Sequence, residues 1–189
     1  MKVKIVLIVF SALLCAGCAK WRIKRQMELL CKSEIRFPSG LEVVRDGRIQ
    51  EHSCDRWPQQ IKLVVYYAAE RCSTCEINRM LVYQELFELE PENFTPVIIM
   101  GSNDMKYDEI VTNLRLQAYS FPVYIDKKDE FPALNPNIPR EPRFHTFLLD
   151  RSDRVILVGD PLSSEPMRAL FKSTLDNMLA HGGKYVTDK

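Results

Sequence analysis

The chain has 189 residues, of which 46% are hydrophobic, and it carries 26 basic and 25 acidic residues and six cysteines. This length and composition allow one sizeable buried core, so we expect a single main domain. The near balance of charge argues against nucleic acid as a partner, because nucleic-acid-binding chains usually carry a clear basic excess.

The first 17 residues have the features of a signal peptide. Lys2 and Lys4 precede a short apolar run, Ile5–Leu14, which is too short to span a bilayer comfortably. Small residues then lead into Cys18, in a pattern that resembles the lipobox of bacterial lipoproteins. The resemblance implies an exported chain with a lipid anchor on Cys18, facing the periplasm or the cell exterior. A plain cleaved signal or an uncleaved anchor is the alternative.

Residues 18–57 are predicted to form a tether and an N-terminal extension. Turn signals at Pro38-Ser39-Gly40 and Asp46-Gly47 indicate a hairpin, and a short helix can precede it. The basic stretch from Lys20 to Arg36 indicates a solvated tether beside the membrane, or alternatively a contact with anionic headgroups.

Four cysteines remain once Cys15 and Cys18 are assigned to the N-terminal segment. Export permits disulfides, and four cysteines allow three connectivities. A Cys72–Cys75 pair in a CxxC motif leaves a possible structural disulfide between Cys31 and Cys54.

Residues 58–182 are predicted to form the main domain, with residues 183–189 as a tail. An almost continuous apolar run predicts a buried strand at Ile61–Ala68, and apolar spacing predicts a helix at Glu76–Glu90. The same patterns predict a strand, a helix and a strand at Val97–Met100, Asp104–Ala118 and Phe121–Asp126.

A loop rich in Pro and Asn is predicted at Phe131–Pro142. Strands at Phe144–Asp150 and Arg154–Val158 then form a hairpin, and an amphipathic helix runs from Ser164 to Gly182. Strands that alternate with helices imply parallel pairing and right-handed crossovers, and the final hairpin adds an antiparallel edge.

This layout, with a CxxC motif at the end of the first core strand, resembles the thioredoxin fold. The stretches VVYYAAERCSTC, FPVYID and RFHTFLLDRSDRVILVG are similar to the TlpA-like or redoxin branch of membrane-tethered extracytoplasmic thioredoxins. The similarity covers residues 58–181. It implies a thioredoxin-like three-layer α/β sandwich with a mixed central sheet, a C-terminal β-hairpin and a final helix.

A CxxC motif at the start of a helix is suited to thiol–disulfide exchange. The helix N-terminus stabilises a thiolate at Cys72, and Cys75 can then attack the mixed disulfide. Arg71 would favour that thiolate, whereas Glu76 would oppose it. Ser73 and Glu76 have the spacing of a capping box that would start the helix.

The resemblance implies an extracytoplasmic thiol–disulfide oxidoreductase that needs no cofactor. Its expected partners are protein or small-molecule thiols and disulfides, and we expect it to be a monomer. A permanent structural disulfide or two inert thiols are the alternatives for the cysteine pair. A peroxidase is less favoured, because that family has Thr or Ser three residues before its cysteine and this chain has Ala69.

His145 stands where the family places a cis-proline that faces the cysteines. Together with Phe144 it is predicted to shape the edge on which substrates dock. Three other roles are open for it: a proton donor or acceptor for Cys72, a metal ligand with Cys72 and Cys75, or a packed histidine with no ligand role. The alternative functions are therefore a metal-binding or metal-delivery module and a redox-inert adaptor.

Overall fold

The computed structural model describes residues 21–51, 59–88 and 92–187. The predicted signal peptide, the proposed lipid anchor Cys18, Cys54 and the expected domain boundary after residue 57 lie outside the described residues. In those three ranges, no helix is both long enough and apolar enough to cross a membrane.

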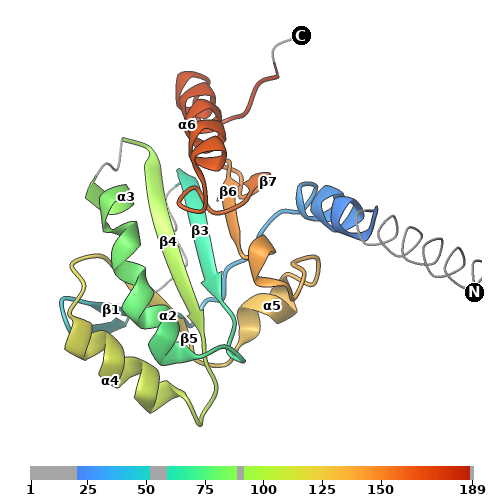
Figure 1. Ribbon diagram of the computed structural model, residues 1–189. Helices are drawn as coiled ribbons and strands as arrows, with labels where there is room; N and C mark the ends of the chain where they lie inside the picture. Colours follow the sequence, from blue (N-terminus) through green and yellow to red (C-terminus); the bar gives the residue numbers. More distant parts are fainter. Residues whose placement is uncertain (1–20, 52–58, 89–91, 188–189) are drawn as a thin grey trace, which may run out of the picture.

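Seven strands within the described ranges form one mixed sheet in the order β2-β1-β5-β4-β3-β6-β7 (Figure 1). The central strands β3, β4 and β5 run parallel. β6 pairs antiparallel with β3 and β1 pairs antiparallel with β5, and the outer strands β7 and β2 pair antiparallel with β6 and β1. The strands are β1 Glu42–Arg45, β2 Arg48–Glu51, β3 Ile61–Tyr67, β4 Phe94–Gly101, β5 Val123–Asp126, β6 Thr146–Leu149 and β7 Val155–Val158.

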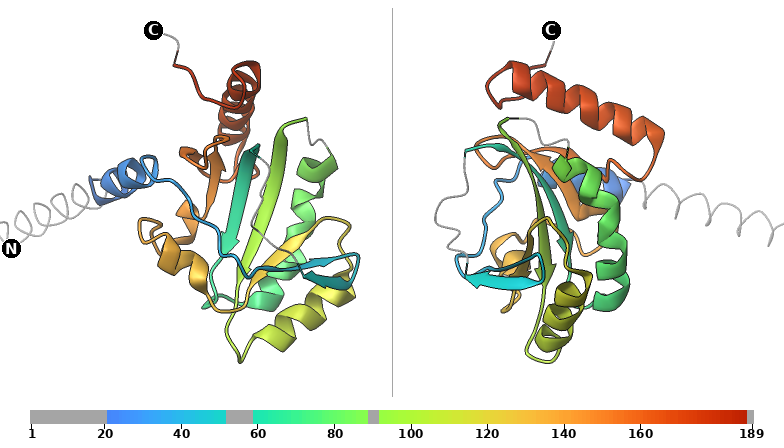
Figure 2. Two further views of the ribbon diagram at one scale, coloured as in Figure 1. Left: turned by 180° about the vertical axis from the view of Figure 1, so that it is seen from behind. Right: turned by 90° about the vertical axis from the view of Figure 1, so that its left-hand side faces the viewer.

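Helices cover both faces of the sheet (Figure 2). They are α2 Ser73–Arg79, η2 Met80–Tyr83, α3 Gln84–Glu88, α4 Tyr107–Gln117, α5 Glu130–Leu134, η3 Pro142–Phe144 and α6 Glu165–Ala180. Residues 21–30 form a further helical segment.

Alternating residues of β3 divide the core between the two faces. Val65 and Tyr67 pack with residues of α2 and α4, and Leu63 packs with α6 on the same face. Val64 and Tyr66 pack on the other face with α5 and with Leu30 and Ile35 of the N-terminal extension. The prediction of an α/β fold with a mixed central sheet, a C-terminal hairpin and a final helix is confirmed.

The N-terminal extension is joined to the same sheet. Its predicted hairpin is present as β1 and β2, and β1 pairs with β5. Residues 33–35 run along the outer edge of β7, where Ile35 N–H donates to the Asp153 carbonyl and Val155 N–H donates to the Ser33 carbonyl. Leu30 and Ile35 are almost completely buried. Residues 30–51 thus add strands and core contacts to the main sheet.

Two predicted segments differ from the structure. The helix expected over Glu76–Glu90 begins earlier and is interrupted by η2, in which the buried residues Met80 and Tyr83 are three apart, the repeat of a 3₁₀ helix. The expected Pro- and Asn-rich loop contains α5. Pro132 is tolerated there because it occupies the first turn, where a backbone N–H has no intrahelical partner.

Candidate active site

The two cysteines of the CxxC motif lie at the carboxyl end of the central strand β3. After Tyr67, the short turn Ala68–Arg71 leads to Cys72, which is the N-cap residue of α2 with an extended backbone. Cys75 lies in the first turn of that helix, and both side chains are exposed. The sequence therefore places two thiols one helical turn apart at the sheet edge where parallel strands end, a common location for functional sites in α/β folds.

The two thiols differ in acidity because of how they contact each other. The backbone N–H and the thiol of Cys75 both donate toward the Cys72 sulfur, and these two contacts lower the pKa of Cys72. The negative charges of Glu109 and Glu76 act against them. The pKa of Cys75 is raised, mainly because its proton is held in the bond to Cys72. Cys72 is thus the more acidic thiol, as required of a nucleophile.

The capping box predicted from Ser73 and Glu76 is wrong. Cys72 caps the helix, with its carbonyl accepting from Glu76 N–H at 3.1 Å, and no side chain caps this end. Instead, the Glu76 carboxylate forms an ion pair with the Arg71 guanidinium. The two groups that were expected to act on Cys72 with opposite signs therefore lie against each other.

Lys106 holds the turn before Cys72 from a distant part of the chain. Its ammonium group donates to the carbonyl oxygens of Ala69 at 2.6 Å and of Arg71 at 2.9 Å. It lies directly before α4, which also contacts α2 through a hydrogen bond from Thr74 to Glu109 at 2.8 Å. Sequence analysis missed Lys106, because no local motif connects it with residues more than thirty positions earlier.

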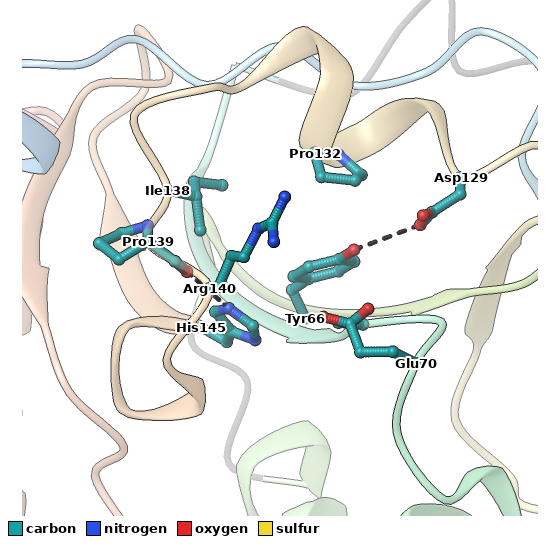
Figure 3. Close-up of a pocket in the computed structure, with 9 residues that line it drawn as sticks. Tyr66, Glu70, Asp129, Pro132, Ile138, Pro139, Arg140 and His145 are labelled. Atoms are coloured by element: carbon teal, nitrogen blue, oxygen red, sulfur yellow. Dashed lines mark hydrogen bonds between the residues drawn. The ribbon is translucent and has the colours of Figure 1, made fainter.

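The imidazole of His145 is directed toward the face of the sheet that α5 covers. Its Nε2 lies 2.8 Å from the Pro139 carbonyl, and its ring packs on Tyr66 with centroids 5.1 Å apart (Figure 3). Burial lowers the pKa of His145. Among the hydrogen bonds of the described residues, none joins this ring to Cys72 or Cys75.

The alternative prediction of a metal site is not supported by the structure. In the described part of the chain, no group of three or more His, Cys, Asp or Glu side chains is arranged to hold a metal ion. Cys72, Cys75 and His145 are all described and do not form such a group. The Nε2 atom of the imidazole is bonded to the Pro139 carbonyl and not to either cysteine.

A groove of about 700 Å³ lies next to the residues that flank the CxxC motif, although neither cysteine lines it. Arg71 and Glu76, on either side of Cys72 in the sequence, line it. Its walls come from α2 and η2 on one side and from β6, β7 and the start of α6 on the other. Phe144 is buried in the core but also lines this groove together with His145, so their role in shaping a docking edge stays a prediction. The apolar lining of the groove includes Val65, Tyr67, Val82, Tyr83, Val158 and Met167.

Of the two cysteines in the predicted Cys31–Cys54 disulfide, the structure describes only Cys31. Cys31 follows the helical segment 21–30 and is a free, exposed cysteine, whereas Cys54 lies outside the described residues. The pairing stays a prediction.

No model of a known protein family matches the sequence, and no curated protein matches it. Solved structures do resemble it. An uncharacterized thioredoxin-like protein from Porphyromonas gingivalis is 10% identical with a TM-score of 0.47, and the match covers 80% of this chain and 97% of that one. A putative protein disulfide isomerase from Bacteroides thetaiotaomicron is 14% identical with a TM-score of 0.49, covering 78% and 92%.

The thioredoxin domain of a thiol-disulfide oxidoreductase from Bacteroides vulgatus is 17% identical with a TM-score of 0.48, covering 75% of this chain and 95% of that one. With TM-scores below 0.5, these likenesses do not assign the chain to a family. The CxxC turn after the central strand β3 and the antiparallel β6–β7 hairpin followed by α6 are those expected from the sequence resemblance. The described residues therefore have the α/β arrangement that the thioredoxin-like resemblance predicts.

Proposed function

We propose that the protein is a thiol–disulfide oxidoreductase in which Cys72 is the nucleophile and Cys75 the resolving thiol. The observation that carries this proposal is the placement of the pair: both thiols are exposed at the start of α2, directly after the central strand β3, where their mutual contact lowers the pKa of Cys72 and raises that of Cys75. Two inert structural thiols would not need this arrangement at an exposed helix start.

The reaction requires two exchanges. The Cys72 thiolate attacks one sulfur of a substrate disulfide, forms a mixed disulfide and releases the other substrate sulfur as a thiolate. Cys75 then loses its proton and attacks the Cys72 sulfur. This step forms the Cys72–Cys75 disulfide, releases the second substrate thiolate and completes the transfer of two electrons to the substrate. The reverse sequence oxidises a substrate dithiol.

The groove beside Cys72 supports a substrate that extends away from its reacting sulfur. Its lining is largely apolar, and the Arg71–Glu76 ion pair lies at its cysteine end. This combination suits a thiol or disulfide within a protein segment, which would place its sulfur at Cys72 and its apolar neighbours between Tyr83 and Val158.

The proposal is tested by equilibrating the purified full-length chain in glutathione redox buffers, trapping free thiols by alkylation and mapping them by mass spectrometry. We expect a reversible Cys72–Cys75 disulfide and, in Cys75→Ser, a glutathione adduct that accumulates on Cys72. Cys31→Ser serves as the matched control and should change neither result. The absence of a reversible pair would refute the oxidoreductase.

A redox-inert adaptor is the second candidate, favoured by the orientation of His145. The imidazole bonds to the Pro139 carbonyl, His145 is 4% exposed, and no hydrogen bond of the described residues joins the ring to Cys72 or Cys75. Steady-state reduction of a disulfide-linked protein separates the two functions. A reversible cysteine pair without any turnover would favour the adaptor.

We also propose that the chain is exported and lipid-anchored through Cys18. The proposal is supported by the apolar run Ile5–Leu14 and the small residues before Cys18. Metabolic labelling with a fatty acid in a bacterial host tests it. The label should appear in the wild-type chain and be absent from Cys18→Ala, and an equally labelled variant would contradict the anchor.

A further inference from the structure

A second pocket lies on the opposite side of the turn that leads to Cys72. It has a volume of about 440 Å³ and opens at the carboxyl end of β3, on the face that α5 covers (Figure 3). Ala68 and Glu70 of the turn belong to its wall, whereas Cys72 and Cys75 do not. Its other lining residues are Tyr66, Asp129, Pro132, Ile138, Pro139, Arg140 and His145.

The wall of this pocket carries a buried hydrogen-bond acceptor that has no partner. A carbonyl oxygen can only accept, so the contact between His145 Nε2 and the Pro139 carbonyl places the ring hydrogen on Nε2. In the neutral ring, Nδ1 is then an acceptor. His145 is 4% exposed, and its Nδ1 is buried without a hydrogen-bond partner. An unpartnered buried polar atom is costly, and a ligand that donates to it would remove that cost.

Two carboxylates line the pocket, Glu70 beside the imidazole and Asp129 on the far side, next to the Tyr66 hydroxyl (Figure 3). In Figure 3 the Nδ1 side of the imidazole is turned toward Glu70, and the Glu70 charge acts on both His145 and Asp129. Asp129 accepts from the Tyr66 hydroxyl at 3.3 Å. Neither carboxylate is in an ion pair within the described ranges. The Arg71 charge also acts on His145. An unpartnered ring nitrogen next to a carboxylate that has no ion pair favours a ligand with an ammonium group, which can donate three hydrogen bonds.

The Arg140 side chain also lines the pocket. The guanidinium of Arg140 lies between Pro132 and Ile138, above the Tyr66 ring (Figure 3). Arg140 also has no ion pair among the described residues. A planar guanidinium without an internal partner is suited to a carboxylate, which it can hold with two parallel hydrogen bonds.

We propose that this pocket binds a small zwitterion, with its ammonium group between His145 Nδ1 and Glu70 and its carboxylate on Arg140. The apolar side chains of Pro132 and Ile138 and the Tyr66 ring would enclose the carbon chain that separates the two charges. The site shares Tyr66 and His145 with the groove of about 700 Å³, but Glu70 and Arg140 line this pocket and not that groove. Binding at it does not depend on the proposed redox function.

The test uses ω-amino acids of increasing length, glycine, β-alanine, 4-aminobutyrate and 6-aminohexanoate, with butylamine and butyrate as single-charge controls. Binding is measured by calorimetry on the full-length Cys72→Ser/Cys75→Ser variant, so a failure here leaves the oxidoreductase proposal untouched. We expect at least one zwitterion to saturate and to bind at least tenfold more tightly than butylamine and butyrate.

Two variants test the assigned contacts. Glu70→Gln and Arg140→Gln should each weaken zwitterion binding at least tenfold, whereas Glu85→Gln and Arg115→Gln, at exposed positions elsewhere, should not. The ¹⁵N resonance of His145 Nδ1 should shift on saturation, as it does when a ring nitrogen accepts a hydrogen bond. The proposal is overturned if no zwitterion saturates, if butylamine binds equally well, or if the His145 resonance stays unchanged at saturation.

Discussion

The ammonium group of Lys106 lies 2.9 Å from the carbonyl oxygen of Arg71, the residue directly before Cys72. A side chain that precedes α4 therefore fixes the turn from which α2 begins. Because Lys106 also bonds the Ala69 carbonyl, it satisfies two carbonyl groups of a turn that has left the β3 ladder.

Replacing Lys106 by Met should loosen this turn. Hydrogen bonds to a charged group contribute about 1.5–3 kcal/mol each, and Lys106 is partly exposed, so we expect the free energy of unfolding to fall by about 2 kcal/mol. The rate at which Cys72 attacks a model disulfide should fall several-fold. Urea unfolding and stopped-flow exchange measure the two effects. Lys128→Met, at an exposed position nearby, is the control, and equal behaviour of both variants would contradict the role of Lys106.

The pH dependence of alkylation should separate the two active-site thiols. Cys72 has the lowered pKa and Cys75 the raised one, so iodoacetamide should modify Cys72 at lower pH. Glu76→Gln removes a negative charge that raises the pKa of Cys72, and its profile should move to still lower pH. Mass spectrometry of each cysteine-containing peptide reads out both profiles. A Cys75 profile that precedes that of Cys72 would reverse the assignment of nucleophile and resolving thiol.

Burial of His145 should make the protein less stable in mild acid. The folded-state pKa lies below the unfolded value of about 6.5, so the unfolded chain takes up a proton that the folded chain does not. The free energy of unfolding should therefore not depend on His145 above about pH 6.5, and it should fall as the pH drops from about 6.5 to the folded-state pKa. Burial raises the pKa values of Asp126 and Asp129, so at lower pH the folded chain takes up protons that the unfolded chain does not, and these two groups favour the folded chain as the pH falls.

Comparison with His145→Gln isolates the histidine. Urea unfolding at several pH values between 7 and 5 should give a steeper loss of stability for the wild-type chain than for the variant, by up to about 1.4 kcal/mol per pH unit. Parallel curves would show that His145 has the same proton affinity in the folded and unfolded chain.

Lys62 is a charged residue inside the central strand, and its removal should be costly. It is 1% exposed, and its ammonium group donates to Asp153 at 2.9 Å and to the Gln60 carbonyl at 3.1 Å. Lys62→Ala should lower the free energy of unfolding by about 3 kcal/mol, since it removes a packed chain and leaves the Asp153 charge without its partner. Asp153→Asn should cost less, because that side chain is 32% exposed. Equal stability of wild type and Lys62→Ala would contradict this account.

The fold was predictable where the sequence pattern is strong and local. The unbroken apolar run of β3 is buried along its whole length, as expected of a strand covered on both faces. The pattern failed at α5, whose first turn is held by a side chain just before it: Asp126 accepts from Phe131 N–H at 2.7 Å. A five-residue helix of this kind has too few periodic positions to be recognised in a Pro-rich segment.

The candidate site was predictable only in its local part. The Cys72–Cys75 spacing after a strand is visible in one stretch of sequence, whereas Lys106 and Arg140 reach the region from other elements. The position of His145 could be read from the sequence, but not its ring orientation, because that depends on the Pro139 carbonyl. Arg71 and Glu76 were read as separate influences on Cys72, and only the structure shows them as a pair.

The hydrogen bonds between residues 33–35 and β7 bear on how the protein avoids self-association. An open outer strand offers unpaired backbone groups to a second molecule, which can extend the sheet and begin aggregation. Here Ser33 accepts from Val155, the first residue of β7, and Ile35 donates to Asp153 just before it, while the opposite outer strand, β2, has only four residues. The N-terminal extension therefore pairs with the beginning of the outer strand, and a chain shortened past Ile35 would leave these backbone groups open to a second molecule.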